Sequence, residues 1–217
     1  MADMVKTQQS SFGSGWLCLE FANTVDWHAS SHPEESLTSY PKLVSWAKTN
    51  GALSASAAQS LLVQAEARPA EAKSVLKRAI ELREAVYHIL SDRVHDLPAR
   101  VSDLDVLNRA ITDMLTRSQL VITGANGFAW GWRDGQASLD AMLWPVVRSA
   151  AELLTSGDKL KRVGQCADEQ GCGWLFMDTS KNKSRRWCNM GDCGNRAKAR
   201  RHYQRLMTSG KMVKNES

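Results

Sequence analysis

The chain has 217 residues, of which 43% are hydrophobic and 24% charged, and a formal net charge of +5. These proportions are ordinary for a soluble globular protein. The apolar runs, such as 141-AMLWPVV, are far shorter than the roughly 18 residues of a membrane span, and 1-MADMVKTQQSSFGSG lacks the apolar segment of a secretory signal. We therefore expect a cytoplasmic protein with no membrane partner.

The N-terminal residues are polar, and the segments after them show the apolar spacing of helices. Residues 1–14 are Ser/Gly-rich and without periodicity, so we expect them to be disordered. From Leu17 to about His28 apolar residues recur at helical spacing, until 31-SHP breaks the segment. Ser54 and Ser102 are expected to cap two later helices. In all, five further helices are predicted before Gly157, at 40–49, 54–67, 69–96, 102–117 and 137–156.

One stretch departs from the helical period. The segment 119-QLVITGANGFAWGWRDG has β-forming residues on both sides of Asn126–Gly127, which predicts a hairpin. Phe128, Trp130 and Trp132 alternate, so their side chains are expected on one face. Pro145 is expected to kink the helix that follows or to mark its first turn.

The predicted fold class is α+β and mostly α. We expect an α-rich domain with one β-hairpin at 15–157 and a small C-terminal module at 158–208, followed by a flexible tail at 209–217. The charge divides at the same place. Residues 158–217 hold 14 Lys and Arg against 6 Asp and Glu, whereas the rest of the chain holds 14 against 17. A mildly acidic body thus carries a basic module, and nucleic acid is the obvious partner for it.

Four of the five cysteines lie in the basic module, with the spacing C-x5-C-x15-C-x4-C. Two close pairs with glycines beside them suit a tetrahedral four-thiolate zinc site, since each pair can bend around one ion. A disulfide-bonded module is the alternative, but nothing in the sequence indicates secretion. Four thiolates leave no position for a water, so this Zn²⁺ is structural. The ligands are Cys166, Cys172, Cys188 and Cys193.

The segments around the cysteines predict a treble-clef-like finger. The stretches 174-WLFMD and 185-RRWC resemble two short strands, and 195-NRAKARRHYQRLM resembles a helix that begins at the last ligands. The remaining cysteine, Cys18, lies alone in an apolar helix and is expected to be a core residue.

Two motifs carry a family resemblance. The segment 185-RRWCNMGDCGNRAKARRHYQR, with its core Cys193-Gly194-Asn195-Arg196, resembles the CGNR zinc-finger family over about 160–206. The segment 17-LCLEFANTVDWH is similar to the opening motif of the ABATE domain, which usually precedes that finger. The resemblance implies a bacterial, stress-related transcription regulator whose N-terminal domain has an unusual α+β fold.

The last helix is predicted to have two faces. Ala199, Tyr203, Leu206 and Met207 share one side, which we expect to pack against the protein. Arg196 lies beside that stripe, where it either holds the finger together or contacts DNA. The other cations are expected to contact phosphates. The full set of candidate DNA-binding residues is Arg185, Arg186, Arg196, Lys198, Arg200, Arg201 and Arg205.

The N-terminal domain offers a weaker candidate site. Glu20, Asn23 and Trp27 lie close together in the first apolar segment, and they are candidate residues for binding a small molecule. The alternative is an amphipathic helix with one buried, hydrogen-bonded Asn. The chain contains no nucleophile elbow, phosphate-binding loop, dinucleotide fingerprint or H-E-x-x-H, so we do not expect an enzyme.

Two functions from different classes fit these patterns. The first is a DNA-binding transcription regulator, whose finger contacts DNA and whose N-terminal domain senses a small molecule or forms a homodimer. The second is an adaptor that uses the finger to bind protein or RNA. A strong preference for duplex DNA would favour the first function, and salt-insensitive binding to a protein would favour the second.

Overall fold

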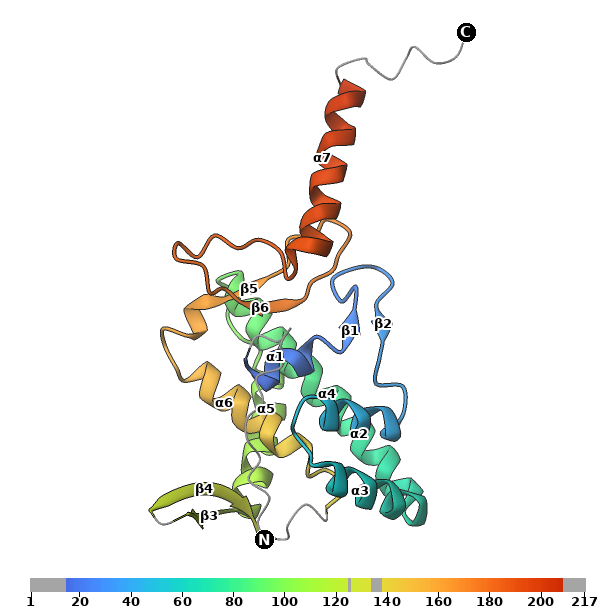
Figure 1. Ribbon diagram of the computed structural model, residues 1–217, viewed down its shortest axis with the longest axis vertical. Helices are drawn as coiled ribbons and strands as arrows, with labels where there is room; N and C mark the ends of the chain where they lie inside the picture. The colour runs from blue at the N-terminus through green and yellow to red at the C-terminus, as the bar shows by residue number, and fades with distance from the viewer. Residues whose placement is uncertain (1–14, 125, 134–137, 209–217) are drawn as a thin grey trace.

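The computed structural model describes residues 15–124, 126–133 and 138–208 (Figure 1). The expected disordered N-terminus (1–14) and flexible tail (209–217) lie outside the described residues. In the described part the helices, in chain order, are α1 (Leu17–Ala22), α2 (Tyr40–Thr49), α3 (Ala55–Ala67), α4 (Pro69–Val94), α5 (Val101–Arg117), α6 (Leu143–Leu154) and α7 (Asn195–Thr208).

The strands of the described residues form separate antiparallel pairs, so the predicted class, α+β and mostly α, is confirmed. A helical turn, η1, precedes the last pair and another, η2, precedes α7. The pairs are β1 (Val25–Asp26) with β2 (Glu34–Glu35), β3 (Ser118–Thr123) with β4 (Gly127–Trp132), and β5 (Val163–Gln165) with β6 (Leu175–Met177); the turns are η1 (Leu160–Arg162) and η2 (Met190–Gly194).

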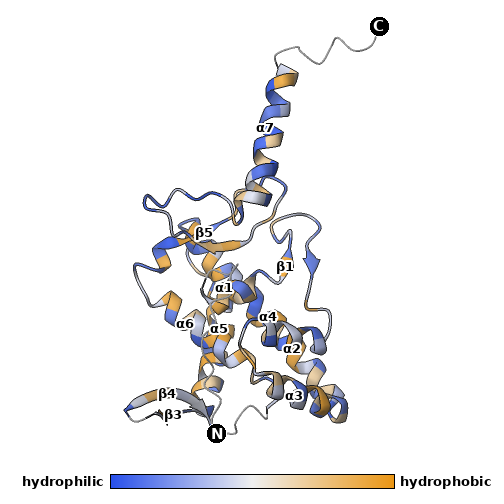
Figure 2. Cartoon of the chain, in the orientation of Figure 1, coloured by the Kyte–Doolittle hydropathy of each residue, from blue (hydrophilic) through white to orange (hydrophobic). Residues whose placement is uncertain are grey.

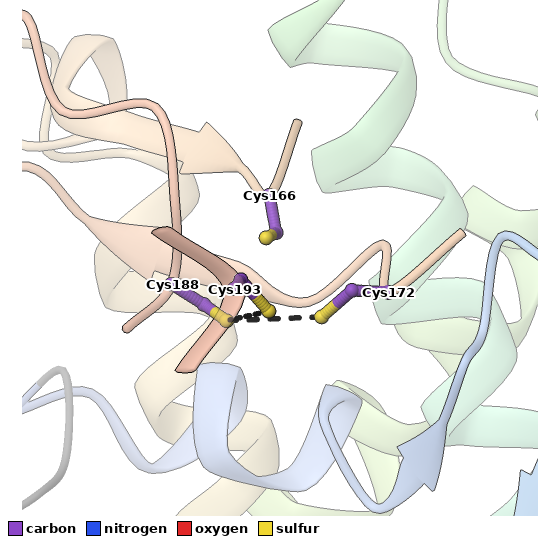
Figure 3. Close-up of side chains that lie close together, drawn as sticks. All are labelled: Cys166, Cys172, Cys188 and Cys193. Carbon is purple, nitrogen blue, oxygen red and sulfur yellow. Dashed lines mark hydrogen bonds between the residues drawn. The ribbon is translucent and has the colours of Figure 1, made fainter. Parts of the chain in front are cut away.

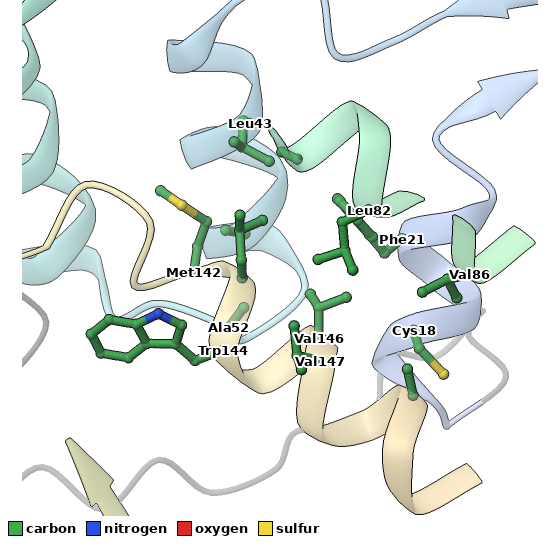
Figure 4. Packing of buried hydrophobic residues seen from close by; sticks show 14 of the residues in the cluster. Cys18, Phe21, Leu43, Ala52, Leu82, Val86, Met142, Trp144, Val146 and Val147 are labelled. Carbon is green, nitrogen blue, oxygen red and sulfur yellow. The ribbon is translucent and has the colours of Figure 1, made fainter. Parts of the chain in front are cut away.

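The long helix α4 is the centre of the helical body, where it contacts α1, α2, α3 and α5. Side chains from α1 to α6 meet in one buried cluster, with Phe21, Leu43, Leu82 and Val146 among them (Figure 4). Burial of each such side chain contributes about 1.5–3 kcal/mol to stability. Cys18 is fully buried in the same cluster, as expected, and burial raises the pKa of its thiol to about 12.

The first helix ends much earlier than the sequence pattern predicts. α1 stops at Ala22, and the residues expected to continue it form β1 and a turn. Asn23 ends the helix because its side chain binds β6: Nδ2 donates to the Leu175 carbonyl and Oδ1 accepts from the Leu175 amide, both at 2.8 Å. Trp27 then adopts a left-handed conformation, with φ of 55°, that no helix allows.

The other helices of the body agree more closely with the predictions. The Ser54 side chain caps α3 as expected, accepting from the Ala57 amide at 3.1 Å. The prediction that Ser102 caps α5 is wrong, because the helix already begins at Val101. α6 begins only at Leu143, so Pro145 lies in its first turn, where a missing N–H costs nothing.

The predicted hairpin is confirmed as β3–β4. Its register pairs Ser118 with Trp132, Leu120 with Trp130 and Ile122 with Phe128, so the alternating aromatic residues do share one face. The base of that face packs on the body, where the Trp132 and Trp144 rings lie 5.0 Å apart, and Arg148 of α6 lies 5.6 Å from the Trp130 ring. The rest of the hairpin extends beyond the helices at the lower end of Figure 1.

The C-terminal module is joined to the helical body through a shared core. β6 pairs with β5, and Val163, Leu175 and Met177 of this pair belong to the same buried cluster as the helices. The prediction that 185-RRWC forms a strand is wrong. Asp178 accepts from the Arg185 amide at 2.9 Å and thereby closes residues 178–185 into a loop. The module thus shares the core of the body through β5 and β6, while Cys166, Cys172 and Cys193 form a second, small buried cluster around the metal site.

Candidate metal centre and basic helix

The four predicted ligands converge on one point (Figure 3). Their sulfur atoms all lie within 4.8 Å of one another; Cys172 Sγ is 3.7 Å and Cys193 Sγ 3.6 Å from Cys188 Sγ. Zn–S bonds of about 2.3 Å in a tetrahedron place sulfurs about 3.8 Å apart. The geometry therefore fits one structural Zn²⁺ bound by Cys166, Cys172, Cys188 and Cys193.

The first ligand pair is held against the helical body. The Cys166 amide donates to the Trp174 carbonyl at 2.8 Å, which continues the β5–β6 pairing. Gly171 and Gly173 flank Cys172 with φ of 88° and 69°. A Cβ on Gly173 would lie 2.7 Å from that of Ala29, so glycine is required both by the backbone conformation and by the close approach of the 27–30 segment.

The same approach is fixed by main-chain hydrogen bonds. The His28 amide donates to the Cys172 carbonyl at 3.1 Å, and the Ala29 amide donates to Gly171 at 3.0 Å. The Trp174 indole donates to the Val25 carbonyl at 2.9 Å. The loop between β1 and β2 thus binds directly to the turn that carries one zinc ligand.

The second ligand pair leads into the basic helix. Asn189 caps η2 by accepting from the Gly191 amide at 2.8 Å, and Cys193 lies in the last turn before α7. A Cβ on Gly194 would lie 2.6 Å from the sulfur of Met190, whose half-exposed side chain packs over this turn. The metal therefore anchors the start of α7.

Arg196 of the CGNR motif lies next to the metal ligands and binds three acceptors. Its guanidinium donates to Asp168, Asp192 and the Cys193 sulfur at distances of 2.6–3.0 Å. It also stacks on Trp27, 4.8 Å from the ring centroid. Burial alone would raise the pKa of Asp168, but hydrogen bonds from the Gln170 amide and Arg196 outweigh it and lower that pKa.

Two other candidate DNA contacts also bind acceptors inside the chain. Arg185 donates to the carbonyls of Trp187, Cys188 and Met177. Arg200 donates to Glu169 at 2.8 Å and to Asp168 at 3.4 Å. In the described part of the chain, Arg201 donates only within its own helix, to the Ala197 carbonyl at 3.3 Å. It lies at an exposed position, as do the other remaining candidates, Arg186, Lys198 and Arg205.

The expected packing face of the last helix is not covered. No described residue of α7 is buried, and Tyr203 and Met207 are 51% and 55% exposed. The helix is anchored only at its start and extends away from the body, with hydrophilic residues over most of its surface (Figure 2). Its apolar residues were expected to pack, but α7 extends away from the other described elements, so that Tyr203 and Met207 stay exposed among the described residues (Figure 1).

The three candidate ligand-binding residues do not line one cleft. Glu20 and Asn23 line a cleft of about 300 Å³ together with Arg185 of the finger. Trp27 lines another, of about 150 Å³, beside Arg196. Asn23 makes the two hydrogen bonds to β6 described above, in line with the alternative of a hydrogen-bonded, structural Asn.

Sequence reasoning missed a polar pocket of about 410 Å³ between α4 and the β1–β2 segment. Arg83 lies in its wall with only 3% of its side chain exposed, paired with Glu35 and Glu84 at 2.7 Å. His28 Nε2 is hydrogen-bonded to the Glu84 carboxylate at 3.0 Å, while its buried Nδ1 has no partner among the described residues. The sole sequence signal was the charge of Arg83 within an apolar stripe of α4.

Glu84 is the centre of this ion-pair network. Burial would raise the pKa of its carboxyl group, but His28 and Arg83 offset that effect and lower the pKa to about 2. The Tyr87 hydroxyl in the same wall donates to the Gly173 carbonyl at 3.1 Å. The pocket and the zinc-binding turn therefore share their supporting residues.

Comparison with known families matches nearly the whole described chain. Residues 15–157 match the ABATE family, described as "Putative stress-induced transcription regulator", and residues 162–206 match the CGNR zinc finger. A search of curated proteins found no match. Among the described residues, no helix has the length and apolar character needed to cross a membrane.

Proposed function

Because the chain belongs to the ABATE family and carries a CGNR zinc finger, we propose that it is a transcription regulator that binds DNA through α7. One observation carries the proposal: an exposed, basic helix projects from a metal-anchored base, clear of the acidic body (Figure 1). An α-helix has a diameter of about 10–12 Å and therefore fits a major groove about 12 Å wide. The 14 residues of α7 provide about 21 Å of length for contacts along it.

Within this proposal the basic residues divide by their contacts. Lys198, Arg201 and Arg205 neutralise phosphates from α7, and Arg186 adds a contact from the loop beside it. Arg185, Arg196 and Arg200 hold the finger, since each already binds acceptors outside α7, whereas Arg201 donates to the Ala197 carbonyl within that helix. The finger is proposed to have a treble-clef arrangement, with α7 as its helix.

The helical body supplies regulation in this proposal. The polar pocket beside Arg83 is the proposed effector site, because its wall includes His28, whose amide binds the Cys172 turn. Its paired carboxylates, Glu35 and Glu84, favour a small ligand with hydrogen-bond donors, such as an amine. The cleft at Glu20 and Asn23 is the second candidate site. We also propose a cytoplasmic location and no catalytic role.

A second candidate function is supported by the exposed apolar residues of α7. Tyr203 and Met207 would suit a protein or RNA surface better than a phosphate backbone. An adaptor would use them together with the cations around them. The two functions differ in their nucleic-acid preference and in their dependence on salt.

The deciding experiment is selection of genomic DNA fragments by the purified, zinc-loaded protein, with zinc-stripped protein as the control. Enrichment of a defined duplex motif that is lost without metal is the expected result. Uniform recovery of all fragments, or none, would contradict the regulator proposal and favour the adaptor. Lys198→Ala/Arg201→Ala/Arg205→Ala should abolish enrichment while keeping the zinc content of the wild type.

A further inference from the structure

The outer part of the β3–β4 hairpin carries a continuous apolar face that the described residues leave largely exposed; Arg148 of α6 reaches only its margin, at Trp130. The register places Leu120 opposite Trp130 and Ile122 opposite Phe128, all on one side. Their exposed fractions are 68%, 45%, 76% and 73% respectively. We call these four side chains the hairpin face. Exposed apolar side chains gathered in this way mark an interaction surface, whereas single ones are ordinary.

The hairpin face lies on the same side of the hairpin as the residues that pack against the helical body. Ser118 and Trp132, at the base of the same side, are in contact with the body, and Trp132 packs on Trp144. Beyond that point the hairpin projects past the helices (Figure 1). Two strands alone are marginally stable in water, so a projecting hairpin gains stability if a second layer covers its apolar side.

We propose that the hairpin face is a homodimer interface, on which a second copy of the chain places its own hairpin face around a two-fold axis. None of the four side chains is charged, so the face is complementary to itself and pairing buries no unmatched charge. Arg148, which lies 5.6 Å from the Trp130 ring at the margin, is already paired with Glu152 at 2.7 Å.

The exposed area of the hairpin face is large enough for contact with a second copy of the chain. The four side chains expose on the order of 500 Å² per copy, so a symmetric contact buries about 1,000 Å² in total, the lower limit for a specific interface. The free edges of β3 and β4 add hydrogen-bonding groups at the rim. We therefore expect a reversible dimer with a dissociation constant on the order of micromolar.

This interface develops the homodimer that the sequence leaves open for the N-terminal domain, and it leaves accessible both copies of the helix that binds DNA in the proposed function. α7 and the hairpin lie at opposite ends of the molecule (Figure 1), so contact between hairpins covers neither copy of α7. A dimer would present two fingers to one DNA molecule and would raise the affinity above that of a single finger.

Sedimentation equilibrium of the full chain without DNA, at about 1–100 µM, tests the proposal. The wild type should be a monomer–dimer mixture, and Ile122→Lys/Phe128→Lys should weaken association at least about 100-fold, because two charges would be buried without partners. Both positions are exposed, so the variant should melt like the wild type. Val63→Lys, on α3 at 57% exposure, is the control and should dimerise normally.

Two results would overturn the proposal: a wild type that stays monomeric at about 100 µM, or a double variant that dimerises as well as the wild type. If the wild type stays monomeric, a variant without residues 1–14 should be measured in the same way. Dimerisation of that variant would show that residues 1–14, and not a second copy, cover the hairpin face of the wild type. If the protein dimerises but selects no duplex DNA, the proposal that it binds DNA is contradicted and the proposed dimer interface is not.

Discussion

Arg196 donates hydrogen bonds from Nε and Nη2 to a single oxygen of Asp168, at 3.0 and 2.9 Å. Asp168 is fully buried at its side chain, and the same Nη2 also reaches the Cys193 sulfur at 2.9 Å. The arginine of the CGNR motif thus joins the two halves of the metal site: Asp168 lies between the two cysteines of the first ligand pair, and Cys193 belongs to the second pair.

Arg196→Lys should therefore weaken metal binding. A lysine keeps the charge but has a single ammonium group, so it cannot reach Asp168, Asp192 and the thiolate together. Loss of such a supporting contact typically lowers metal affinity by about 10–100-fold. Competition with a chromophoric chelator measures the change. Arg201→Lys, on the exposed side of α7, should leave zinc affinity unaltered; equal affinity in both variants would show that Arg196 does not support the site.

Cys188→Ser should release zinc and disorder the second half of the finger while β5 and β6 stay folded. Val163, Leu175 and Met177 keep the strands in the core of the body, independently of the metal. α7 has no buried residue to hold it once its anchor is lost. Hydrogen exchange should show lost protection over 188–208 and retained protection over 175–177. Unchanged zinc content would contradict the four-cysteine site.

Removal of the three exposed cations of α7 should flatten the salt dependence of DNA binding. Each phosphate contact contributes about 0.9 to the slope of log K against log[salt], so Lys198→Ala/Arg201→Ala/Arg205→Ala should reduce it by about 3. Titrations of a labelled duplex at several salt concentrations measure the slope. Lys42→Ala/Lys48→Ala, on α2, is a control that should keep it; an unaltered slope in the triple variant would mean that another surface contacts DNA.

Glu84→Gln should make the protein less sensitive to acid. The folded-state pKa of Glu84, about 2, lies below the unfolded value of about 4.3, so its contribution to stability is present above the latter and lost as pH falls towards the former. Chemical denaturation between pH 5 and 3 should show a shallower loss of stability in the variant than in the wild type.

The control for this comparison is Glu66→Gln, an exposed position on α3. It should follow the wild-type pH dependence, including the part that arises from zinc release as the thiolates are protonated. If the free energy of unfolding of Glu84→Gln fell with pH in parallel with that of the wild type and of Glu66→Gln, the network of Arg83, Glu84 and His28 would not be what holds the Glu84 carboxylate charged.

Features set by neighbouring residues could be predicted from the sequence. The cysteine spacing predicted the zinc ligands because each pair needs only a local turn to place its thiolates together. Helices α2, α3 and α4 followed from apolar periodicity and nearby caps or breakers. The hairpin followed from strand-forming residues around Asn126–Gly127. In each of these cases, the residues that form the sequence pattern are the same residues that form the structural feature, so no distant partner is needed.

Contacts between distant residues were decided only by the tertiary structure. α1 ends at Ala22 because Asn23 binds Leu175, 152 positions away, and no local pattern contains that partner. The same holds for the strand pairing of β5 with β6 and for the pocket around Arg83, which the loop between β1 and β2 closes. Periodicity identifies the apolar face of a helix, but only the packed chain determines whether something covers it. In α7 and in the hairpin face, the sequence marks apolar side chains, but the other described elements leave them largely exposed.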